Sequence, residues 1–184
     1  TERDITAISD LVLDLCGIYL DNSKGYLIET RLADVVRKHG CESYLALADR
    51  AKSGAQENLR REIVDQITTN ETLFFRDRSP FEALQHKLIP ELIDARESSA
   101  FPRRLRIWSA ACSTGQEAYS IAMTLVDTIP DYQSWDIQII GTDISQAAVE
   151  QANKGVYNKL EISRGMTPLH QSKFFTAEGD TWKV

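Results

Sequence analysis

The sequence is poor in the residues that build disulfide frameworks and metal sites. Among its 184 residues only three are cysteine and only three are histidine. The cysteines (Cys16, Cys41 and Cys112) form no Cys-x-x-Cys pair, which argues against a disulfide framework and a zinc site and favours the reducing cytoplasm as location. The histidines show no metal-ligand spacing. We therefore expect no bound metal.

Long apolar runs and an excess of basic residues are also missing. No apolar stretch approaches the roughly 20 residues that cross a membrane, and no signal-peptide pattern opens the chain. The formal net charge is −6, whereas nucleic-acid binding requires a basic surface. The apolar fraction of 42% and the charged fraction of 26% are typical of a globular protein with one or two domains. We expect neither membrane insertion nor a nucleic-acid partner.

The first part of the chain has the periodicity of helices. Apolar stripes predict four short amphipathic helices joined by short links, over residues 5–15, 24–39, 42–51 and 59–67. A further helix is expected to start at Ser79-Pro80-Phe81-Glu82, with Ser79 as its N-cap. Pro90 is expected to kink or split that helix. A polar link over Arg96–Arg104 follows, and its basic cluster is interpreted as a solvated strand entry.

Residues 104–123 combine a strand pattern, a small-residue turn and a helix pattern. Leu105, Ile107 and Trp108 form the β-rich run, the turn is Cys112-Ser113-Thr114-Gly115, and helical spacing continues from Ala118 to Pro130. A strand, tight turn and helix in this order can hold a nucleotide-like cofactor at the carboxyl edge of a sheet. Small residues let a ligand approach the backbone, and the helix start offers free N–H groups.

A second strand is expected over Trp135–Thr142, and it ends at Asp143. A carboxylate at this position can accept hydrogen bonds from ribose hydroxyls, although helix capping is the alternative interpretation. Only Gly115 stands in the first turn, so the Gly-x-Gly-x-x-Gly of dinucleotide sites is absent. A cofactor with ribose and adenine but no phosphate is favoured, and S-adenosylmethionine is the obvious candidate.

The last forty residues predict small elements. A helix is expected from Ser145 to Gly155, short helical turns over Asn158–Ser163 and after Thr167-Pro168, and a hairpin around Glu178-Gly179-Asp180. Only two parallel strands are evident, whereas an open α/β sheet commonly has about five or more. We therefore expect the chain to be a truncated piece of a longer α/β protein.

Two motifs resemble signatures of the CheR family, the chemotaxis receptor methyltransferases that modify protein glutamates. The first is Trp-Ser-Ala-Ala-Cys-Ser-Thr-Gly-Gln-Glu-Ala-Tyr-Ser-Ile-Ala-Met at 108–123, and the second is Thr-Thr-Asn-Glu-Thr-Leu-Phe-Phe-Arg-Asp at 68–77. The resemblance extends over essentially the whole chain. It implies a small all-α receptor-recognition domain over 1–70, a linker and connecting helix over 71–103, and the first half of a class I, Rossmann-like methyltransferase domain over 104–184, which ends at the start of an inserted β subdomain.

The resemblance also implies which residues bind S-adenosylmethionine and its product S-adenosylhomocysteine: Asn70, Thr72, Arg76, Ala110, Gly115, Glu117 and Asp143. From the residues alone, Glu117 equally suits the helix dipole, and the polar cluster before Arg76 equally suits helix capping. Arg76 would neutralise the methionine carboxylate, a task that suits the guanidinium fork. Phe74, Phe75 and Cys112 are interpreted as packing residues.

The implied acceptors are glutamates on the cytoplasmic domains of bacterial chemoreceptors, which become methyl esters. A glutamate is already ionised near pH 7, so no general base is needed and no catalytic side chain is predicted. The resemblance places receptor docking on the helix from Lys24, where Lys24, Arg31 and Lys38 form one stripe flanked by Arg37. From spacing alone, a solvated amphipathic helix is the alternative.

Two other functions compete with this one. A CheR-like module could bind receptors or a regulatory adaptor without turnover. A nucleic-acid methyltransferase is disfavoured by the acidity of the chain and by the lack of an [Asn/Asp]-Pro-Pro-[Tyr/Phe] motif. Gln116 and Ala118 depart mildly from the family pattern, in which Glu and Pro are frequent.

Overall fold

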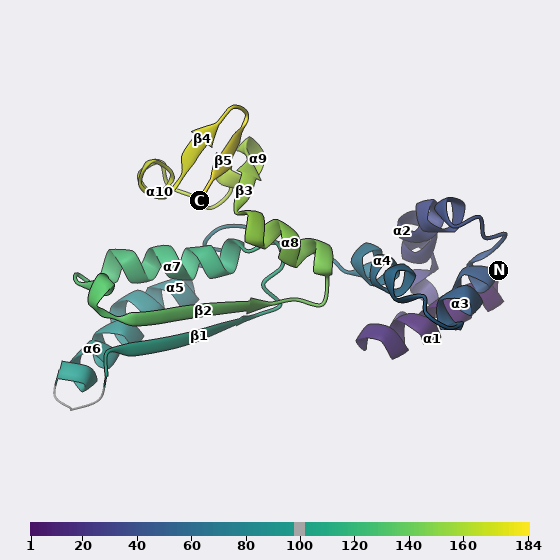
Figure 1. The fold of residues 1–184 in the computed structure, drawn as a ribbon, viewed down its shortest axis with the longest axis horizontal. Coiled ribbons are helices and arrows are strands. Elements are labelled where there is room, and N and C mark those ends of the chain that lie inside the picture. The colour runs from purple at the N-terminus through teal and green to yellow at the C-terminus, as the bar shows by residue number, and fades with distance from the viewer. Residues whose placement is uncertain (98–101) are drawn as a thin grey trace. The chain divides into compact units, whose positions relative to one another are not determined.

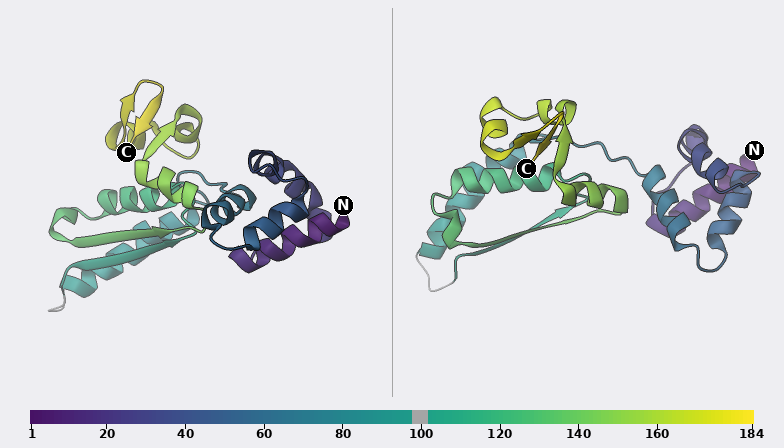
Figure 2. Two further views of the ribbon diagram at one scale, coloured as in Figure 1. Left: turned by 45° about the vertical axis from the view of Figure 1, so that its right-hand side comes forward. Right: turned by 45° about the horizontal axis from the view of Figure 1, so that its top comes forward.

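The computed structural model describes residues 1–97 and 102–184, which form two compact units (Figures 1 and 2). One unit contains residues 1–69 together with 144–147, and the other contains 70–143 together with 148–184. Part of the expected polar link, residues 98–101, lies outside the described residues.

Residues 1–69 form four α-helices, as the periodicity predicts. They are α1 (Glu2–Cys16), α2 (Gly25–Lys38), α3 (Tyr44–Lys52) and α4 (Glu57–Ile67), with a 3₁₀ turn, η1 (Asn22–Lys24), before α2. One apolar stripe from each helix faces a common core. Its buried residues are Ile8, Leu11, Val12, Leu20, Ile28, Leu32, Val35, Leu47, Ala48, Ala51, Leu59, Ile63 and Ile67. This confirms the expected all-α first part.

Side chains set the start of α3 and its attachment to α1. The helix begins two residues later than expected, because Ser43 Oγ accepts a hydrogen bond of 3.1 Å from the Ala46 N–H and so caps it. Asp4 Oδ1 accepts a bond of 2.9 Å from the Leu45 N–H. The carboxylate of α1 thereby satisfies a backbone donor in the first turn of α3.

The helix after the linker has three parts: α5 (Ser79–Ala83), the π-helical turn η2 (Leu84–Leu88) and α6 (Ile89–Glu97). The expectation that Ser79 is the N-cap is wrong. Ser79 is the first helical residue, and Arg78 precedes it without a side-chain cap, because the first turn already closes from the Glu82 N–H to the Arg78 carbonyl at 3.0 Å. The expected interruption at Pro90 is present as the π turn, since proline has no N–H to donate to the preceding turn.

Two parallel strands follow in the predicted order. β1 (Arg104–Ala110) pairs with β2 (Asp136–Thr142) in a register that runs from Arg104 opposite Asp136 to Ala110 opposite Thr142. They are connected through α7 (Gln116–Thr128) and the short η3 (Tyr132–Ser134), and α7 runs along the strands (Figure 1). A strand, crossover helix and parallel strand make up the repeating unit of a Rossmann-like domain. The expected α/β class is confirmed.

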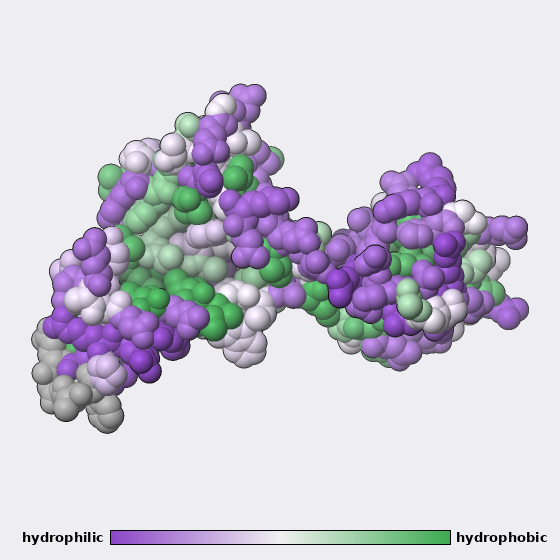
Figure 3. Space-filling view, in the orientation of Figure 1, coloured by the Kyte–Doolittle hydropathy of each residue, from purple (hydrophilic) through white to green (hydrophobic). Residues whose placement is uncertain are grey.

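The two faces of this sheet differ. Leu105 and Ile107 pack with residues of the helices in a core that contains Ile89, Leu125, Ile129 and Trp135, and apolar surface is visible between α7 and the strands (Figure 3). On the opposite face, Trp108 is 70% exposed and Ile140 is 48% exposed. Side chains alternate between the faces of a strand, so within residues 1–97 and 102–184 helices cover one face of this sheet and leave the other exposed.

Small elements complete the chain. They are α8 (Gln146–Lys154), β3 (Val156–Asn158), α9 (Lys159–Ser163), α10 (Pro168–Phe174), β4 (Thr176–Glu178) and β5 (Thr181–Lys183). The predicted hairpin is confirmed as β4 and β5, and β3 joins it in an antiparallel sheet of order β3-β5-β4. β3 was not predicted, because three residues are too few to show a period. A second core consists of Phe74, Met123, Tyr157, Ile162 and Phe175, and Trp182 of β5 packs against it.

Within the described residues, no helix combines the length and the apolarity that a membrane crossing requires.

Candidate functional site

The turn between β1 and α7 has a strained backbone. Ala111, Ser113 and Gly115 have positive φ angles of 58°, 50° and 96°. This left-handed conformation is easy for glycine but costs a residue with a Cβ about 1–3 kcal/mol. Strain of this kind persists only where surrounding contacts hold the backbone. The residues that hold this turn are therefore candidates for the functional site.

The tip of β2 supplies two of these contacts. The Cys112 N–H donates to the Thr142 carbonyl at 2.9 Å, and the Ser113 N–H donates to Asp143 Oδ2 at 2.8 Å. Asp143 therefore stands where the sequence placed it, at the end of the second strand, and its carboxylate faces the turn. Ala110, at the end of β1, is exposed beside it. Small exposed residues next to a carboxylate suit a ribose with free hydroxyls.

The segment that begins at Asn70 reaches the same turn. The Asn70 carbonyl accepts a hydrogen bond of 3.2 Å from Ser113 Oγ, and the half-buried Thr72 follows two residues later. Phe74 is fully buried, as predicted for a packing residue. The structure thus brings the Asn70 segment and the β1–α7 turn together within one unit.

Arg76 lies between two residues with left-handed backbone, Phe75 (φ 51°) and Asp77 (φ 53°). The Phe75 N–H donates to Ser120 Oγ on α7 at 3.0 Å, and Arg76 Nη1 donates to the Glu71 carbonyl at 2.7 Å. The first bond holds the backbone just before Arg76, and the second ties the exposed guanidinium to the linker backbone. Such a group can pair with a carboxylate through two parallel bonds.

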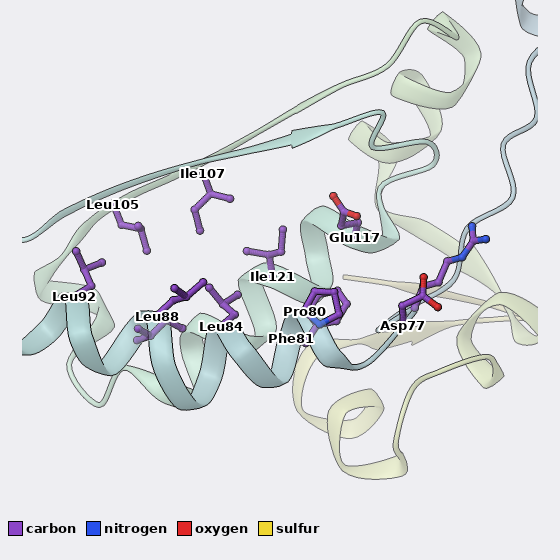
Figure 4. Close-up of a pocket in the computed structure, with 12 residues that line it drawn as sticks. Asp77, Pro80, Phe81, Leu84, Leu88, Leu92, Leu105, Ile107, Glu117 and Ile121 are labelled. Carbon is purple, nitrogen blue, oxygen red and sulfur yellow. The ribbon is translucent and has the colours of Figure 1, made fainter.

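A cavity of about 560 Å³ lies beside Arg76. Figure 4 shows its apolar part, where Leu84, Leu88 and Leu92 face the β1 side chains, and its polar part, which contains Asp77 and Glu117. Glu117 Oε1 accepts a bond of 2.7 Å from Ser109 Oγ, which is buried. The predicted residues Arg76 and Glu117 therefore line one cavity, together with the acidic Asp77.

Two residues of the turn have roles in packing. Cys112 is buried and its burial raises the pKa of the thiol, and its Sγ would lie 2.9 Å from a Cβ at Gly141. A Cβ at Gly115 would lie 2.9 Å from the Ala152 Cβ and 3.0 Å from Tyr157 Oη. Gly115 is thus required by close packing as well as by its positive φ.

Sequence reasoning missed Tyr157 and gave no individual role to Ser109 and Ser113. The Tyr157 hydroxyl donates to the Thr114 carbonyl at 2.8 Å, across 43 positions of the chain. No local pattern reports a contact at that separation. Ser109 lies in β1 and Ser113 in the turn, and the only signal for them was their place in the strand, turn and helix pattern.

The predicted receptor-binding cations lie in the other unit, on or next to α2. Arg31 Nη1 donates to the carbonyls of Ile67 and Thr68 at 2.5 and 3.1 Å, and its Nη2 donates to Thr69 Oγ1 at 3.0 Å. The half-buried Arg31 therefore caps the end of α4. The exposed cations Lys38 and Arg37 pair with Glu62 and Asp34, whereas Lys24 is half-buried at the start of the helix.

Among residues 1–97 and 102–184, no group of three or more His, Cys, Asp or Glu side chains is arranged to hold a metal ion.

Comparison with known proteins identifies both parts of the chain. Residues 3–68 match the family model described as the CheR methyltransferase all-alpha domain, and residues 70–184 match that of the CheR methyltransferase SAM-binding domain.

Individual relatives agree with these matches. A chemotaxis protein methyltransferase of Vibrio parahaemolyticus is 42% identical over 182 residues, which are 98% of this chain and 64% of the relative. Chemotaxis protein methyltransferase 1 of Pseudomonas aeruginosa is 40% identical over 173 residues, which are 92% of this chain and 61% of the relative. The chain thus spans about three fifths of the length of these relatives. With matches in both parts, in this order, the chain belongs to the CheR methyltransferase family.

Proposed function

We propose that the protein containing this chain transfers a methyl group from S-adenosylmethionine to glutamate side chains of bacterial chemoreceptors in the cytoplasm. Family membership and the names of the relatives support this activity. The observation that carries the proposal is the joining of three segments at one strained turn, through the Ser113 bonds to Asp143 and to Asn70.

The residues present fit this cofactor. We propose that the adenosine lies along residues 109–115, with Asp143 accepting bonds from the ribose hydroxyls. Arg76 would pair with the methionine carboxylate, and Glu117 in the same cavity offers an acceptor for the ammonium group. Asn70 and Thr72 would complete the polar contacts from the linker side. The apolar remainder of the cavity helps to exclude water from the site.

The chain's residues have to bind and align the reactants rather than move a proton. S-adenosylmethionine, when bound, supplies an electrophilic methyl group. The glutamate acceptor is ionised near pH 7, so none of the candidate residues has to act as a base. Rigid placement is the main contribution that the protein can make to such a reaction. The bonds that hold Ser113 and Phe75 are suited to this role.

We further propose that residues 1–70 form a domain that recognises the receptor and that residues 104–184 form the first half of the methyltransferase domain. Residues 71–103 would be the linker and connecting helix between these two domains. Arg37 and Lys38 on α2 would contact receptor carboxylates. Their present partners are exposed or half-buried acids, and surface ion pairs of this kind are worth only about 0–1 kcal/mol. They can therefore be exchanged for receptor glutamates at little cost. Arg31 and Lys24 would add positive charge beside this face.

The test uses methyl-labelled S-adenosylmethionine and the full-length protein encoded by the gene that contains this sequence. Receptor-containing membranes should acquire label that alkali releases as methanol, as a methyl ester requires, while nucleic acid should remain unlabelled. Receptor binding without label would instead favour the non-catalytic module. Label in nucleic acid but not in receptors would contradict the proposal.

A further inference from the structure

We propose that Tyr157 is a positioning residue for the cofactor-binding turn, acting through its hydroxyl on the Thr114 carbonyl. The inference rests on the proposed cofactor site, and it gives the small sheet after β2 a role in organising that site.

The hydroxyl acts on a peptide group inside the strained turn. Tyr157 Oη donates to the Thr114 carbonyl at 2.8 Å, between two residues with positive φ, Ser113 and Gly115. The peptide group is planar and trans, so the Thr114 carbonyl and the Gly115 N–H point in opposite directions. Holding the carbonyl therefore aims the N–H at the Cys112 carbonyl, which it contacts at 2.9 Å.

The ring of Tyr157 is itself held firmly. Its residue exposure is 1%, and it packs edge-to-face on Phe74 with ring centroids 5.0 Å apart. Phe175 and Tyr119 provide further edge contacts. A ring in such a setting cannot turn its hydroxyl away without disrupting the aromatic core.

One side chain thus touches two of the three segments that carry the proposed cofactor residues. The hydroxyl holds the turn that contains Gly115, and the ring packs on Phe74, two residues before Arg76. Tyr157 comes from β3, which pairs with the hairpin strand β5 and not with the parallel sheet. The relative placement of the turn and the linker therefore depends on the small sheet.

The donor is present across the working pH range. Burial, with minor contributions from Tyr119, Glu161 and Cys112, raises the pKa of Tyr157 far above its usual value. The hydroxyl therefore stays protonated. Its removal would leave the Thr114 carbonyl without this donor while the ring still fills its space.

Tyr157→Phe removes the oxygen alone, and Tyr119→Phe is the matched control. Tyr119 Oη donates to the Ala152 carbonyl on α8, also at 2.8 Å, and not to the Thr114 carbonyl of the turn. Calorimetry should use the full-length protein and S-adenosylhomocysteine. The affinity of Tyr157→Phe should be about two- to tenfold lower than that of wild type, which corresponds to the loss of one neutral hydrogen bond. The Tyr119→Phe variant should bind like wild type.

Hydrogen exchange without ligand provides an independent measurement. Amides of residues 112–116 should exchange faster in Tyr157→Phe than in wild type or Tyr119→Phe. Unchanged exchange of these amides in Tyr157→Phe, or an equal effect of both variants, would overturn the positioning role. If wild type binds S-adenosylhomocysteine and Tyr157→Phe binds it equally well, the positioning role is also overturned. If wild type fails to bind S-adenosylhomocysteine, the proposed cofactor site fails, whereas the exchange comparison still decides what Tyr157 does.

Discussion

The Ser113 N–H donates a hydrogen bond of 2.8 Å to Asp143 Oδ2, so that the carboxylate at the tip of β2 holds the turn that follows β1. Because Ser113 has a φ of 50°, this bond helps to maintain a conformation that costs about 1–3 kcal/mol. Asp143 thus organises the turn, besides the ribose contact that we propose for its carboxylate.

Substitution at Asp143 should separate these two tasks. Asp143→Ala should weaken S-adenosylhomocysteine binding by about 1.5–3 kcal/mol, the usual worth of a hydrogen bond to a charged group, and should also lower the melting temperature. Asp143→Asn keeps an acceptor for the Ser113 N–H, so it should recover stability more than affinity. Calorimetry and thermal unfolding measure the two effects. Unchanged affinity in Asp143→Ala would exclude the ribose role.

Arg76 should depend on its fork as well as its charge. Arg76→Lys keeps the positive charge but loses the two parallel donors that suit a carboxylate, so cofactor affinity should fall by about 1 kcal/mol or more. Arg78→Lys, at a nearby exposed arginine, is the control. Wild-type affinity in Arg76→Lys, measured by calorimetry, would return Arg76 to a purely structural role in the linker.

Docking through α2 should respond to Arg37 and Lys38 without loss of fold. Reversal of both to Glu should leave cofactor affinity and melting temperature near wild type, lower the rate of receptor methylation, and flatten its dependence on salt. Arg61→Glu is the control, because Arg61 on α4 has a similar surface pair, with Glu57. Methylation at the wild-type rate at low ionic strength would exclude this face.

Arg31 should behave differently from its neighbours on α2. Its guanidinium makes three hydrogen bonds to residues 67–69, so Arg31→Glu would leave carbonyls at the end of α4 without partners. We expect a loss of about 1–3 kcal/mol in the free energy of unfolding, measured by denaturant titration, whereas reversal of Arg37 should cost less than about 1 kcal/mol. Equal small losses would show that the Arg31 bonds are unimportant.

Acid should weaken the attachment of α10 to α7. His170 Nε2 lies 2.9 Å from Asp127 Oδ2, and Lys173 Nζ donates to Oδ1 at 2.5 Å. Burial by itself raises the pKa of Asp127, but hydrogen bonds from Lys173 and His170 outweigh it and leave the folded pKa below its usual value. A carboxyl with a lowered folded pKa stabilises the protein above its unfolded pKa of about 3.9, and this stabilisation is lost as the pH falls through the folded value.

Asp127→Asn should therefore lower the free energy of unfolding by about 0.5–1 kcal/mol at pH 7. The difference from wild type should shrink as the pH falls below about 4. Asp180→Asn, in the exposed hairpin turn, should show little difference at either pH. A deficit in Asp127→Asn that is constant from neutral to acid pH would contradict the assignment.

The sequence by itself determined the elements whose period is repeated over several turns. Sequence patterns predicted the apolar stripes of α1, α2 and α4, because helices bury residues at fixed spacings. They also predicted the order of β1, the turn and α7, and the position of Asp143 at the end of β2. The family resemblance was also visible in the sequence, because each of its two motifs is an unbroken run of residues. In each case the information lies in neighbouring residues.

Only the tertiary structure decided how distant segments meet. The Tyr157 hydroxyl on Thr114, the Arg31 guanidinium on the end of α4, and the pairing of β3 with β5 join residues far apart in the chain. Such contacts depend on where packing brings the backbone, and a single polar side chain carries no periodic signal of its partner. The same holds for Ser79, whose expected cap was lost because the helix closed its first turn on Arg78.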